Sequence, residues 1–319
     1  KPYQTDEIST DSSVSIYVIH SPYGIDWSSP SALVKSTMSN SFAYVGYYTD
    51  KNGKVVEKKP FENGDIYFNQ LKNHPISHME VGIRCAGEPA IYTGMTTGDD
   101  LEAPSDMFLN GYGLGILLKT QEGALETGPH VANEIQKRKK YVGHIAEMRL
   151  KVNTQQCALV KNYLKEYIEK GVDKKYGSLT DRALHGNGAG CAAFAVSFAQ
   201  ALNLIPVRDE EIQKNHFANE WRRSVEISEN FLGDANKDAA IGVIGLWKSS
   251  QIYPWVMPNT KTTKIDFWDP EKIYDWIVSA SRGQKQITYQ AMGKYSESVE
   301  VPYPMQNSSS EYMFSVELN

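Results

Sequence analysis

The spacing of apolar residues changes at Asn153, and this change limits the folds that the chain can adopt. Upstream, segments such as 14–20 and 144–152 alternate between apolar and polar residues, which is typical of β-strands. After Asn153, apolar residues recur at helical spacing as far as Gly171, so a helix is expected to end there. Strands first, then helices, then mixed elements predict an α+β fold.

Local patterns predict the remaining elements. A hairpin is expected over 112–126, where a glycine-containing apolar run precedes a Gln-Glu-Gly turn. The other expected strands are 42–48, 54–58, 64–68, 77–84, 286–290 and 311–317. The other expected helices are 28–34, 191–202, 208–232 and 269–280.

A glycine-rich turn over 187–190 leads into the apolar, alanine-rich segment 191–202. Cys191 therefore falls on the first turn of the expected helix, where unpaired N–H groups and the helix dipole stabilise a thiolate. The same turn, including Gly190, supplies amide donors that can bind an oxyanion of the substrate. The alternative is that Cys191 is a small apolar residue buried behind a flexible loop.

The chain contains three cysteines, Cys85, Cys157 and Cys191, so at least one thiol stays free. A Cys85–Cys157 disulfide that leaves Cys191 reactive is one possible arrangement. Neither a CxxC motif nor a His/Cys cluster has the spacing of zinc ligands. We therefore expect no metal and no cofactor.

Charge and hydropathy exclude some partners. The formal net charge is −5, and the densest basic run, 137–140, is short, so nucleic acid is not an expected partner. No apolar run is long enough to span a bilayer, so no integral membrane segment is expected. The chain begins at Lys1 rather than Met, and residues 5–13 resemble a loose segment after a removed export signal. An exported protein, whether periplasmic, on the outer surface or secreted, is the corresponding expectation.

A cysteine nucleophile needs a base, which is usually a histidine. Of the seven histidines only His216 follows Cys191, and it lies in a polar segment expected to be helical. The base is therefore expected upstream, and His78 is the first candidate because it lies on the expected strand 77–84, where Glu80 and Gly82 share its face. His144 is the second candidate, and His185 is too close to Cys191 in sequence to approach it well. The alternative for His78 is a half-buried strand histidine bonded to a neighbour.

These segments resemble a known family. Residues 64–68 (GDIYF) followed by 77–83 (SHMEVGI) resemble the strand pair that carries the histidine in NlpC/P60-type papain-like cysteine hydrolases. Those enzymes usually carry the cysteine before this pair, whereas here Cys191 follows it, after an expected helix and Lys175-Tyr176-Gly177. That order resembles the circularly permuted members, the YiiX-like and lecithin:retinol acyltransferase-like proteins.

The resemblance spans about residues 64–202, and residues 125–131 resemble the stretch that follows the histidine strand in that group. The chain departs from the pattern in two ways. Ala192 stands where the family usually has serine after the cysteine, and the stretch at 125–131 lies farther from His78 than the family pattern leads one to expect. The second departure bears on the identity of the third catalytic residue.

The resemblance implies a permuted papain-like core over 61–235, with elaborations at 1–60, which is β-rich, and at 236–319. It also implies that Cys191 is the nucleophile, that His78 is the base, and that Glu126 orients the imidazole. Tyr92 and Thr93, on the strand after His78, are alternatives for that orienting role. The candidate substrate-binding residues are Glu80, Tyr92, Thr93 and Gly190.

The implied activity is that of a cysteine peptidase or amidase acting on a peptidoglycan stem peptide or another peptide. Two alternatives stay open. A lipid acyltransferase or thioesterase would use the same Cys-His pair with an apolar acyl groove. A non-catalytic relative that binds the cell wall or a partner would keep Cys191 buried and unreactive.

Overall fold

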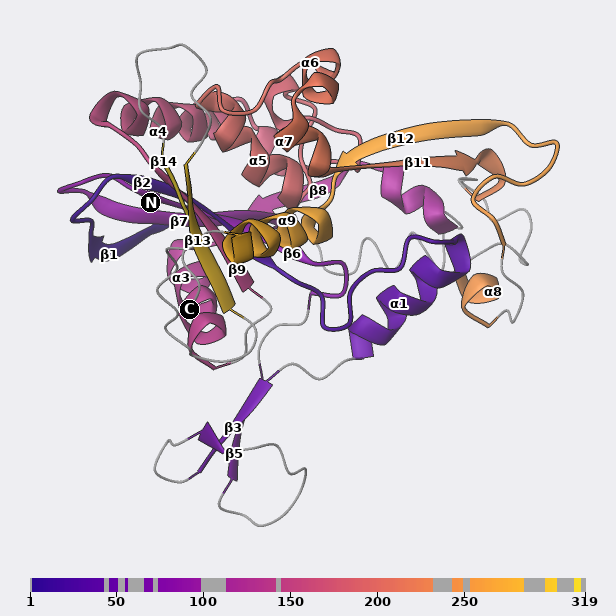
Figure 1. The fold of residues 1–319 in the computed structure, drawn as a ribbon, viewed down its shortest axis with the longest axis horizontal. Helices are drawn as coiled ribbons and strands as arrows, with labels where there is room; N and C mark the ends of the chain where they lie inside the picture. The colour runs from indigo at the N-terminus through magenta and orange to yellow at the C-terminus, as the bar shows by residue number, and fades with distance from the viewer. Residues whose placement is uncertain are drawn as a thin grey trace.

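The fold is described from a computed structural model for residues 2–42, 46–50, 55–56, 66–70, 74–98, 113–141, 145–231, 243–248, 253–283, 296–302 and 313–316. Its centre is a nine-stranded, mostly antiparallel sheet in the order β10-β8-β7-β6-β2-β9-β13-β14, with β1 also paired to β7 (Figure 1). The strands are β1 (Gln4–Ile8), β2 (Ser13–Ile19), β6 (His78–Arg84), β7 (Pro89–Thr97), β8 (Gln121–Leu125), β9 (Ile145–Lys151), β10 (Lys175–Tyr176), β13 (Ser296–Pro302) and β14 (Met313–Val316). The expected α+β class is confirmed.

Helices cover both faces of this sheet. On one face α4 (Thr154–Glu169), α5 (Cys191–Ala201) and α9 (Pro270–Gly283) pack against the central strands, while α3 (Gly128–Tyr141) covers the other face (Figure 1). The helix α5 is mostly apolar and is buried from Cys191 to Gln200, because it lies between α4 and the strands β6 and β7. The side chains of β6 alternate between the two faces of the sheet, as predicted. Met79, Val81 and Ile83 point to the face covered by α5 and belong to the same hydrophobic core as that helix.

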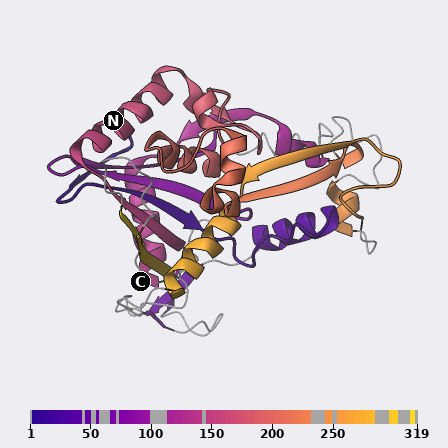
Figure 2. The same cartoon turned by 45° about the horizontal axis from the view of Figure 1, so that its top comes forward.

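A second body extends from the end of the sheet (Figure 2). It contains the antiparallel pair β11 (Arg222–Ser228) and β12 (Thr262–Trp268), together with α1 (Pro30–Phe42) and α8 (Val243–Lys248). Side chains of these elements and of the 3-10 helices Gly113–Leu118 and Glu229–Phe231 form a hydrophobic cluster of their own: Leu33, Val34, Leu114, Val225, Ile227, Phe231, Leu246, Ile265 and Phe267. The short helices α6 (Asp209–Lys214) and α7 (His216–Glu220) connect α5 to β11.

A separate small sheet consists of β3 (Gly46–Asp50), β4 (Val55–Val56) and β5 (Ile66–Gln70). The segment 64–68, one half of the sequence resemblance, includes the start of β5, which pairs with β3 rather than with β6. Gly64 and Asp65 lie outside the described residues.

The structure confirms the expected elements at 14–20, 144–152, 153–171, 191–202 and 269–280, and β14 matches 311–317. Four expectations were wrong. Residues 113–118 form a 3-10 helix instead of a strand, and residues 222–228 are the strand β11 instead of helix. Residues 5–13 are not loose, because β1 pairs with β7 and β2 begins at Ser13, and the strand expected at 42–48 is β3 at 46–50. The strand expected at 286–290 lies outside the described residues.

The proposed domain boundaries stay a prediction, but the sheet adds two facts about them. The strand β2, from the segment expected as an N-terminal elaboration, lies between β6 and β9 at the centre of the sheet. The strands β13 and β14, from the expected C-terminal elaboration, extend the same sheet beyond β9. Among the described residues, no helix is long and apolar enough to cross a membrane.

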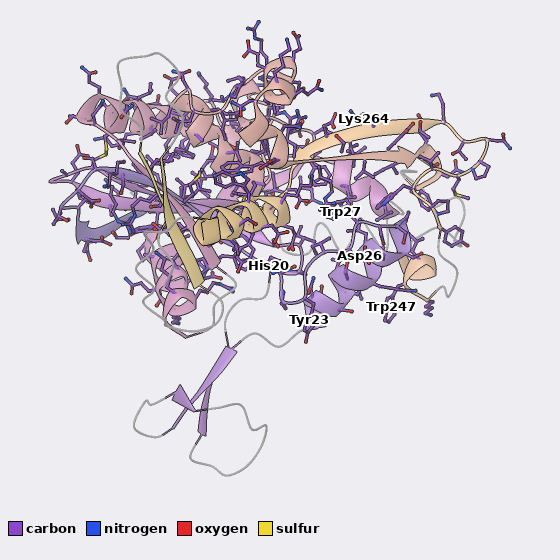
Figure 3. The ribbon with its side chains drawn as sticks, viewed as in Figure 1. His20, Tyr23, Asp26, Trp27, Trp247 and Lys264 are labelled. Carbon is purple, nitrogen blue, oxygen red and sulfur yellow. A yellow bond between two sulfur atoms is a disulfide. The ribbon has the colours of Figure 1, made fainter. Side chains whose placement is uncertain are left out.

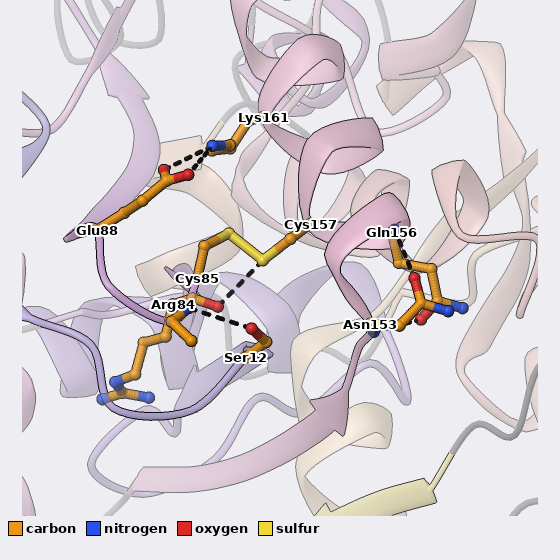
Figure 4. Close-up of a disulfide and its surroundings, with 9 residues drawn as sticks. Ser12, Arg84, Cys85, Glu88, Asn153, Gln156, Cys157 and Lys161 are labelled. Atoms are coloured by element: carbon orange, nitrogen blue, oxygen red, sulfur yellow. Dashed lines mark hydrogen bonds and ion pairs between the residues drawn. A yellow bond between two sulfur atoms is a disulfide. The ribbon is translucent and has the colours of Figure 1, made fainter.

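A disulfide between Cys85 and Cys157 joins the end of β6 to α4, with the Cα atoms 5.9 Å apart (Figure 4). This is the pairing that the cysteine count left open, and Cys191 is the free thiol. An ion pair from Lys161 to Glu88, at 2.7 Å, lies beside the bridge. The helix α4 supports α5, so the disulfide fixes the layer on which Cys191 is carried.

Removing the disulfide in the Cys85→Ala/Cys157→Ala variant should lower the free energy of unfolding by about 4 kcal/mol. The reason is that the bridge closes a loop of 72 residues, which restricts the unfolded chain. Guanidinium unfolding of wild type and variant measures the difference, and reduction of the wild type should reproduce it. Equal unfolding midpoints would show that the bridge contributes nothing.

Candidate active site

Glycines in the turn before α5 place Cys191 at the helix N-terminus. Gly188 has a φ of 111°, which favours glycine, and a Cβ there would lie 2.8 Å from the carbonyl oxygen of Lys175. A Cβ on Gly177 would lie 2.8 Å from the amide nitrogen of Ala189. The turn therefore packs directly against the backbone of β10, and Gly190 becomes the residue that caps α5. The thiol of Cys191 follows at the positive end of the helix.

His78 is the first residue of β6, and the turn before it is held by polar contacts. Ser77 has a φ of 63°, an uncommon conformation for a residue other than glycine. Its hydroxyl oxygen accepts the amide of Ser21 at 2.8 Å, and its hydroxyl also donates to the carboxylate of Glu271. Glu271 additionally binds His20 at 2.6 Å, at the end of β2 (Figure 3). These contacts compensate the strained turn, and they fix the direction in which β6 begins.

Glu126 accepts a hydrogen bond from His78, with 2.7 Å between Oε2 and Nε2. Both side chains are buried, and Glu126 directly follows β8. Its backbone is held at both ends, because its amide donates to the carbonyl of Gly94 at 2.9 Å and its carbonyl accepts the hydroxyl of Thr93 at 3.0 Å. The residue expected to orient His78 therefore contacts it. This bond uses Nε2, which leaves Nδ1 for the thiol.

Gly94 provides the space in which this pair forms. A Cβ at Gly94 would lie 2.5 Å from Oε2 of Glu126 and 3.3 Å from Nε2 of His78. Gly94 stands opposite Glu80 in the ladder between β6 and β7, so its missing side chain opens room on the face of β6 that carries His78. Only glycine leaves the imidazole and the carboxylate in contact.

The thiol of Cys191 hydrogen-bonds with His78 and also interacts with the amide of Met79 and the hydroxyl of Tyr176. Burial opposes ionisation of the thiol, but the hydrogen bond and positive charge of His78 outweigh it, so the pKa of Cys191 lies below its ordinary value. Burial likewise disfavours the imidazolium, but the charges of Glu126 and Cys191 hold the pKa of His78 well above its ordinary value. Together these shifts favour a thiolate–imidazolium pair, which is the nucleophilic form of a cysteine.

Tyr176 supports the thiolate from the strand β10. Burial raises the pKa of its hydroxyl well above the ordinary value, and the charge of Cys191 adds to this effect. The phenol therefore stays protonated and can donate to the thiolate. Its oxygen also interacts with the backbone amide of Cys191, which places it at the start of α5 beside the amides that could hold an oxyanion.

A second histidine stacks on His78. The rings of His74 and His78 are parallel within 3°, with their centroids 4.6 Å apart. His74 bonds to Glu134 at 2.9 Å, and Glu134 also accepts a hydrogen bond of 2.6 Å from Arg138. Burial lowers the pKa of His74 to about 3, so the ring is neutral at neutral pH. It adds a flat surface against His78 without adding a like charge.

Glu80 lies fully buried on the same strand face as His78, and neither carboxylate oxygen has a hydrogen-bond partner among the described residues. Burial raises the pKa of Glu80 well above its ordinary value, and the charge of Glu134 adds to the shift. One ligand atom from each of His78, Glu80 and Glu126 lies within 4.8 Å of the other two. Among the described residues, this is the group of His, Cys, Asp and Glu side chains whose ligand atoms are close enough together to hold a metal ion.

The structure brings together Cys191, His78 and Glu126, the three residues expected to be catalytic. It places the candidate substrate-binding residues differently. Tyr92 and Thr93 are buried on β7, where Tyr92 packs on the α3 side of the sheet and Thr93 bonds to Glu126. Tyr92, Thr93 and Glu80 are all buried, and their contact with a substrate stays a prediction. Gly190 is half-buried at the start of α5 and stays a candidate.

The other histidine candidates lie elsewhere or are not described. His185 is exposed on a short 3-10 helix before α5, His144 lies outside the described residues, and the side chain of His216 is not described. Three contributors to the site had no assigned role in the sequence analysis: Tyr176, His74 and Gly94. Only Tyr176 carried a signal, within the motif Lys175-Tyr176-Gly177.

Comparison of the chain with protein-family models, with curated protein sequences and with solved structures gave no match.

Proposed function

We propose that this protein is a thiol-dependent hydrolase that cleaves amide bonds, in which Cys191 is the nucleophile, His78 the proton carrier and Glu126 the residue that orients the imidazole. The observation that carries the proposal is the buried chain of contacts from Cys191 through His78 to Glu126. The lowered pKa of Cys191 and the raised pKa of His78 favour the thiolate and the imidazolium that these two roles require.

In the proposed reaction the thiolate of Cys191 attacks the carbonyl carbon of the substrate, and the oxyanion that forms faces the amides at the start of α5 and the hydroxyl of Tyr176. The imidazolium of His78 then donates its proton to the leaving amine, which leaves a thioester on Cys191. Neutral His78 next accepts a proton from water, whose oxygen attacks the thioester. Release of the carboxylic acid restores the thiolate–imidazolium pair.

A permuted papain-like core is part of the proposal. Its support is the arrangement in which a cysteine at the N-terminus of α5 packs on an antiparallel sheet whose strand β6 begins with the histidine. The order of His78, Glu126 and Cys191 along the chain agrees with the permuted group. The pairing of β5 with β3, and not with β6, is a departure from the sequence resemblance.

We infer an exported protein acting on peptides, with a peptidoglycan stem peptide as the first substrate to test. The Cys85–Cys157 disulfide supports export, because such bonds persist in oxidising compartments. The substrate class comes from the sequence resemblance.

The proposal is tested by hydrolysis of a panel of peptidoglycan fragments and fluorogenic peptide amides. Wild type should cleave at least one member and should form a thioester on Cys191 that mass spectrometry detects after rapid acid quenching. Cys191→Ala should do neither, while its unfolding midpoint stays close to that of wild type. Equal hydrolysis by Cys191→Ala would exclude the proposed nucleophile.

Replacing Tyr176 by phenylalanine should lower kcat/KM by roughly 10- to 100-fold, because the variant loses one hydrogen bond to the thiolate and one donor to the oxyanion. The pKa of Cys191 should rise at the same time. Steady-state kinetics and a thiolate titration measure the two effects. Tyr163→Phe is the matched control, since it removes a buried hydroxyl that bonds to Ser197 and not to Cys191.

A further inference from the structure

The buried carboxyl group of Glu80 is the least explained feature of the site. It lies in the interior with neither oxygen hydrogen-bonded to any described group, although buried polar atoms in proteins are almost always paired. Of the groups that face it, His78 and Glu126 each have a ligand atom within 4.8 Å of a Glu80 oxygen. An unpaired carboxylate beside an imidazole and a second carboxylate is a donor set that suits a divalent transition metal.

We propose that His78, Glu80 and Glu126 form a binding site for Zn²⁺ or a similar divalent transition metal, and that the bound ion silences Cys191. Binding displaces the imidazolium proton of His78 and any proton on Glu80 to solvent. Two carboxylates and a neutral imidazole then balance the two charges of the ion, so the occupied site is neutral in its buried position. Three protein ligands would leave one coordination position for water. The metal site does not depend on the proposed function. Only the predicted effect of the metal on Cys191 rests on the proposed function.

The geometry requires small movements. Zinc–ligand distances of about 2.1 Å put tetrahedral ligand atoms about 3.4 Å apart. The Nε2 atom of His78 and the Oε2 atom of Glu126 are 2.7 Å apart, and all three ligand atoms lie within 4.8 Å of one another. A shift of roughly 1 Å in each side chain therefore suffices. Glu80 can move without breaking a hydrogen bond of its side chain to any described residue.

Gly94 brings no side chain to the proposed site. It stands opposite Glu80 in the ladder, and a Cβ there would approach both Glu126 and His78. A larger residue at this position would therefore crowd two of the three ligand residues.

The effect on Cys191 follows from the tautomer of the imidazole. A metal bound at Nε2 displaces the proton from that atom, so the neutral ring carries its proton on Nδ1. Nδ1 then has no lone pair with which to accept the thiol proton. Zinc should therefore slow both alkylation of Cys191 and any hydrolysis that depends on it.

The test is calorimetric titration of chelator-treated, full-length protein with Zn²⁺ at neutral pH. Wild type should bind one equivalent, and Glu80→Gln, which keeps the size of the side chain, should bind at least about tenfold more weakly. Cys191→Ala should bind as wild type does, since the thiol is not a ligand. His185→Ala, which removes an exposed histidine, is the control for adventitious binding. Unfolding curves without metal check that each variant folds. If Glu80→Gln does not fold, Glu80→Met takes its place in the titration.

Unchanged zinc affinity in Glu80→Gln, or lost affinity in Cys191→Ala, would overturn the site. The second readout is the ratio of the Cys191 alkylation rate with zinc to the rate without it, measured within each variant. That ratio should fall at least tenfold in wild type and stay near one in Glu80→Gln. If zinc binds but does not slow the alkylation of Cys191, the proposed silencing is wrong and the metal site stands. If the protein hydrolyses no substrate but still binds zinc through Glu80, the metal site stands and the proposed function fails.

Discussion

Replacing His78 by glutamine is expected to lower kcat/KM by at least about a thousandfold. The imidazole contributes to every proton transfer in the proposed reaction, and it also keeps the pKa of Cys191 below its ordinary value. Glutamine can still hydrogen-bond to Glu126, but it can neither carry the positive charge nor accept the thiol proton. The measurement is hydrolysis of a fluorogenic peptide that wild type cleaves, together with the alkylation rate of Cys191.

His185→Gln is the matched control for this prediction. His185 lies only a few residues before Cys191 in the chain, but it is exposed on a short 3-10 helix. We expect its replacement to leave both rates within about twofold of wild type, which is well under 1 kcal/mol. If His185→Gln loses activity while His78→Gln keeps it, His78 is not the base and the proposed assignment is wrong.

Replacing Gly94 by alanine is expected to lower kcat/KM by about a hundredfold or more, although the residue lies on β7 and carries no chemical group. The added Cβ would lie 2.5 Å from Oε2 of Glu126, so the carboxylate must move by roughly 1 Å to reach ordinary van der Waals contact. Displacements of that size at catalytic groups cost about two orders of magnitude in rate. Glu126 would then no longer hold the ring of His78 toward Cys191.

The control is Gly82→Ala on the neighbouring strand. A Cβ there would lie 3.1 Å from the rings of Tyr17 and Tyr92, so this variant is overpacked as well and should lose about 1–3 kcal/mol of stability. Gly82 is distant along β6 from His78, and the variant should keep its kcat. If both variants lose stability and only Gly94→Ala loses activity, the effect belongs to the catalytic geometry. Equal losses of activity in the two variants would show that the loss in Gly94→Ala comes from general destabilisation of the fold.

The sequence was sufficient for features whose signals are local. Glycines followed by alanines predicted α5 with Cys191 at its start, and the alternation after Ser77 predicted β6 with His78 on it. The strand β11 also had a local signal that the helix prediction passed over, because Val225 and Ile227 alternate with Ser224 and Glu226. The run 113–118 is apolar with glycines, and such runs do not distinguish a strand from a tightly wound 3-10 helix.

The features that the sequence could not predict depend on contacts between distant segments. The stack of His74 on His78 and the room left by Gly94 arise only when β6, β7 and α3 come together. The resemblance identified Glu126, but its contact with His78 depends on the bonds that tie its backbone to Thr93 and Gly94. The burial of Tyr92 and Thr93 was not predictable either, because a strand pattern does not tell what will cover each face of the sheet. Tyr92 packs on the α3 side, whereas Thr93 stands opposite Val81, which belongs to the core that contains α5.

The central claim is that Cys191 is a thiolate paired with an imidazolium, and its pH dependence has a definite sign. A lowered pKa of Cys191 means that the thiolate persists to a lower pH than that of an ordinary cysteine and is lost as the pH falls through that lowered value. A raised pKa of His78 means that the imidazolium persists as the pH rises above the ordinary range. The ion pair should therefore exist between these two limits.

The most direct measurement is the ultraviolet absorption of the Cys191 thiolate as a function of pH, taken as the difference between wild type and Cys191→Ala in the presence of a chelator. Cys85 and Cys157 form a disulfide and do not contribute. We predict a midpoint below the value of about 8.5 for a free thiol, and an upward shift of that midpoint in His78→Gln. A wild-type midpoint at or above 8.5, unchanged in His78→Gln, would contradict the account.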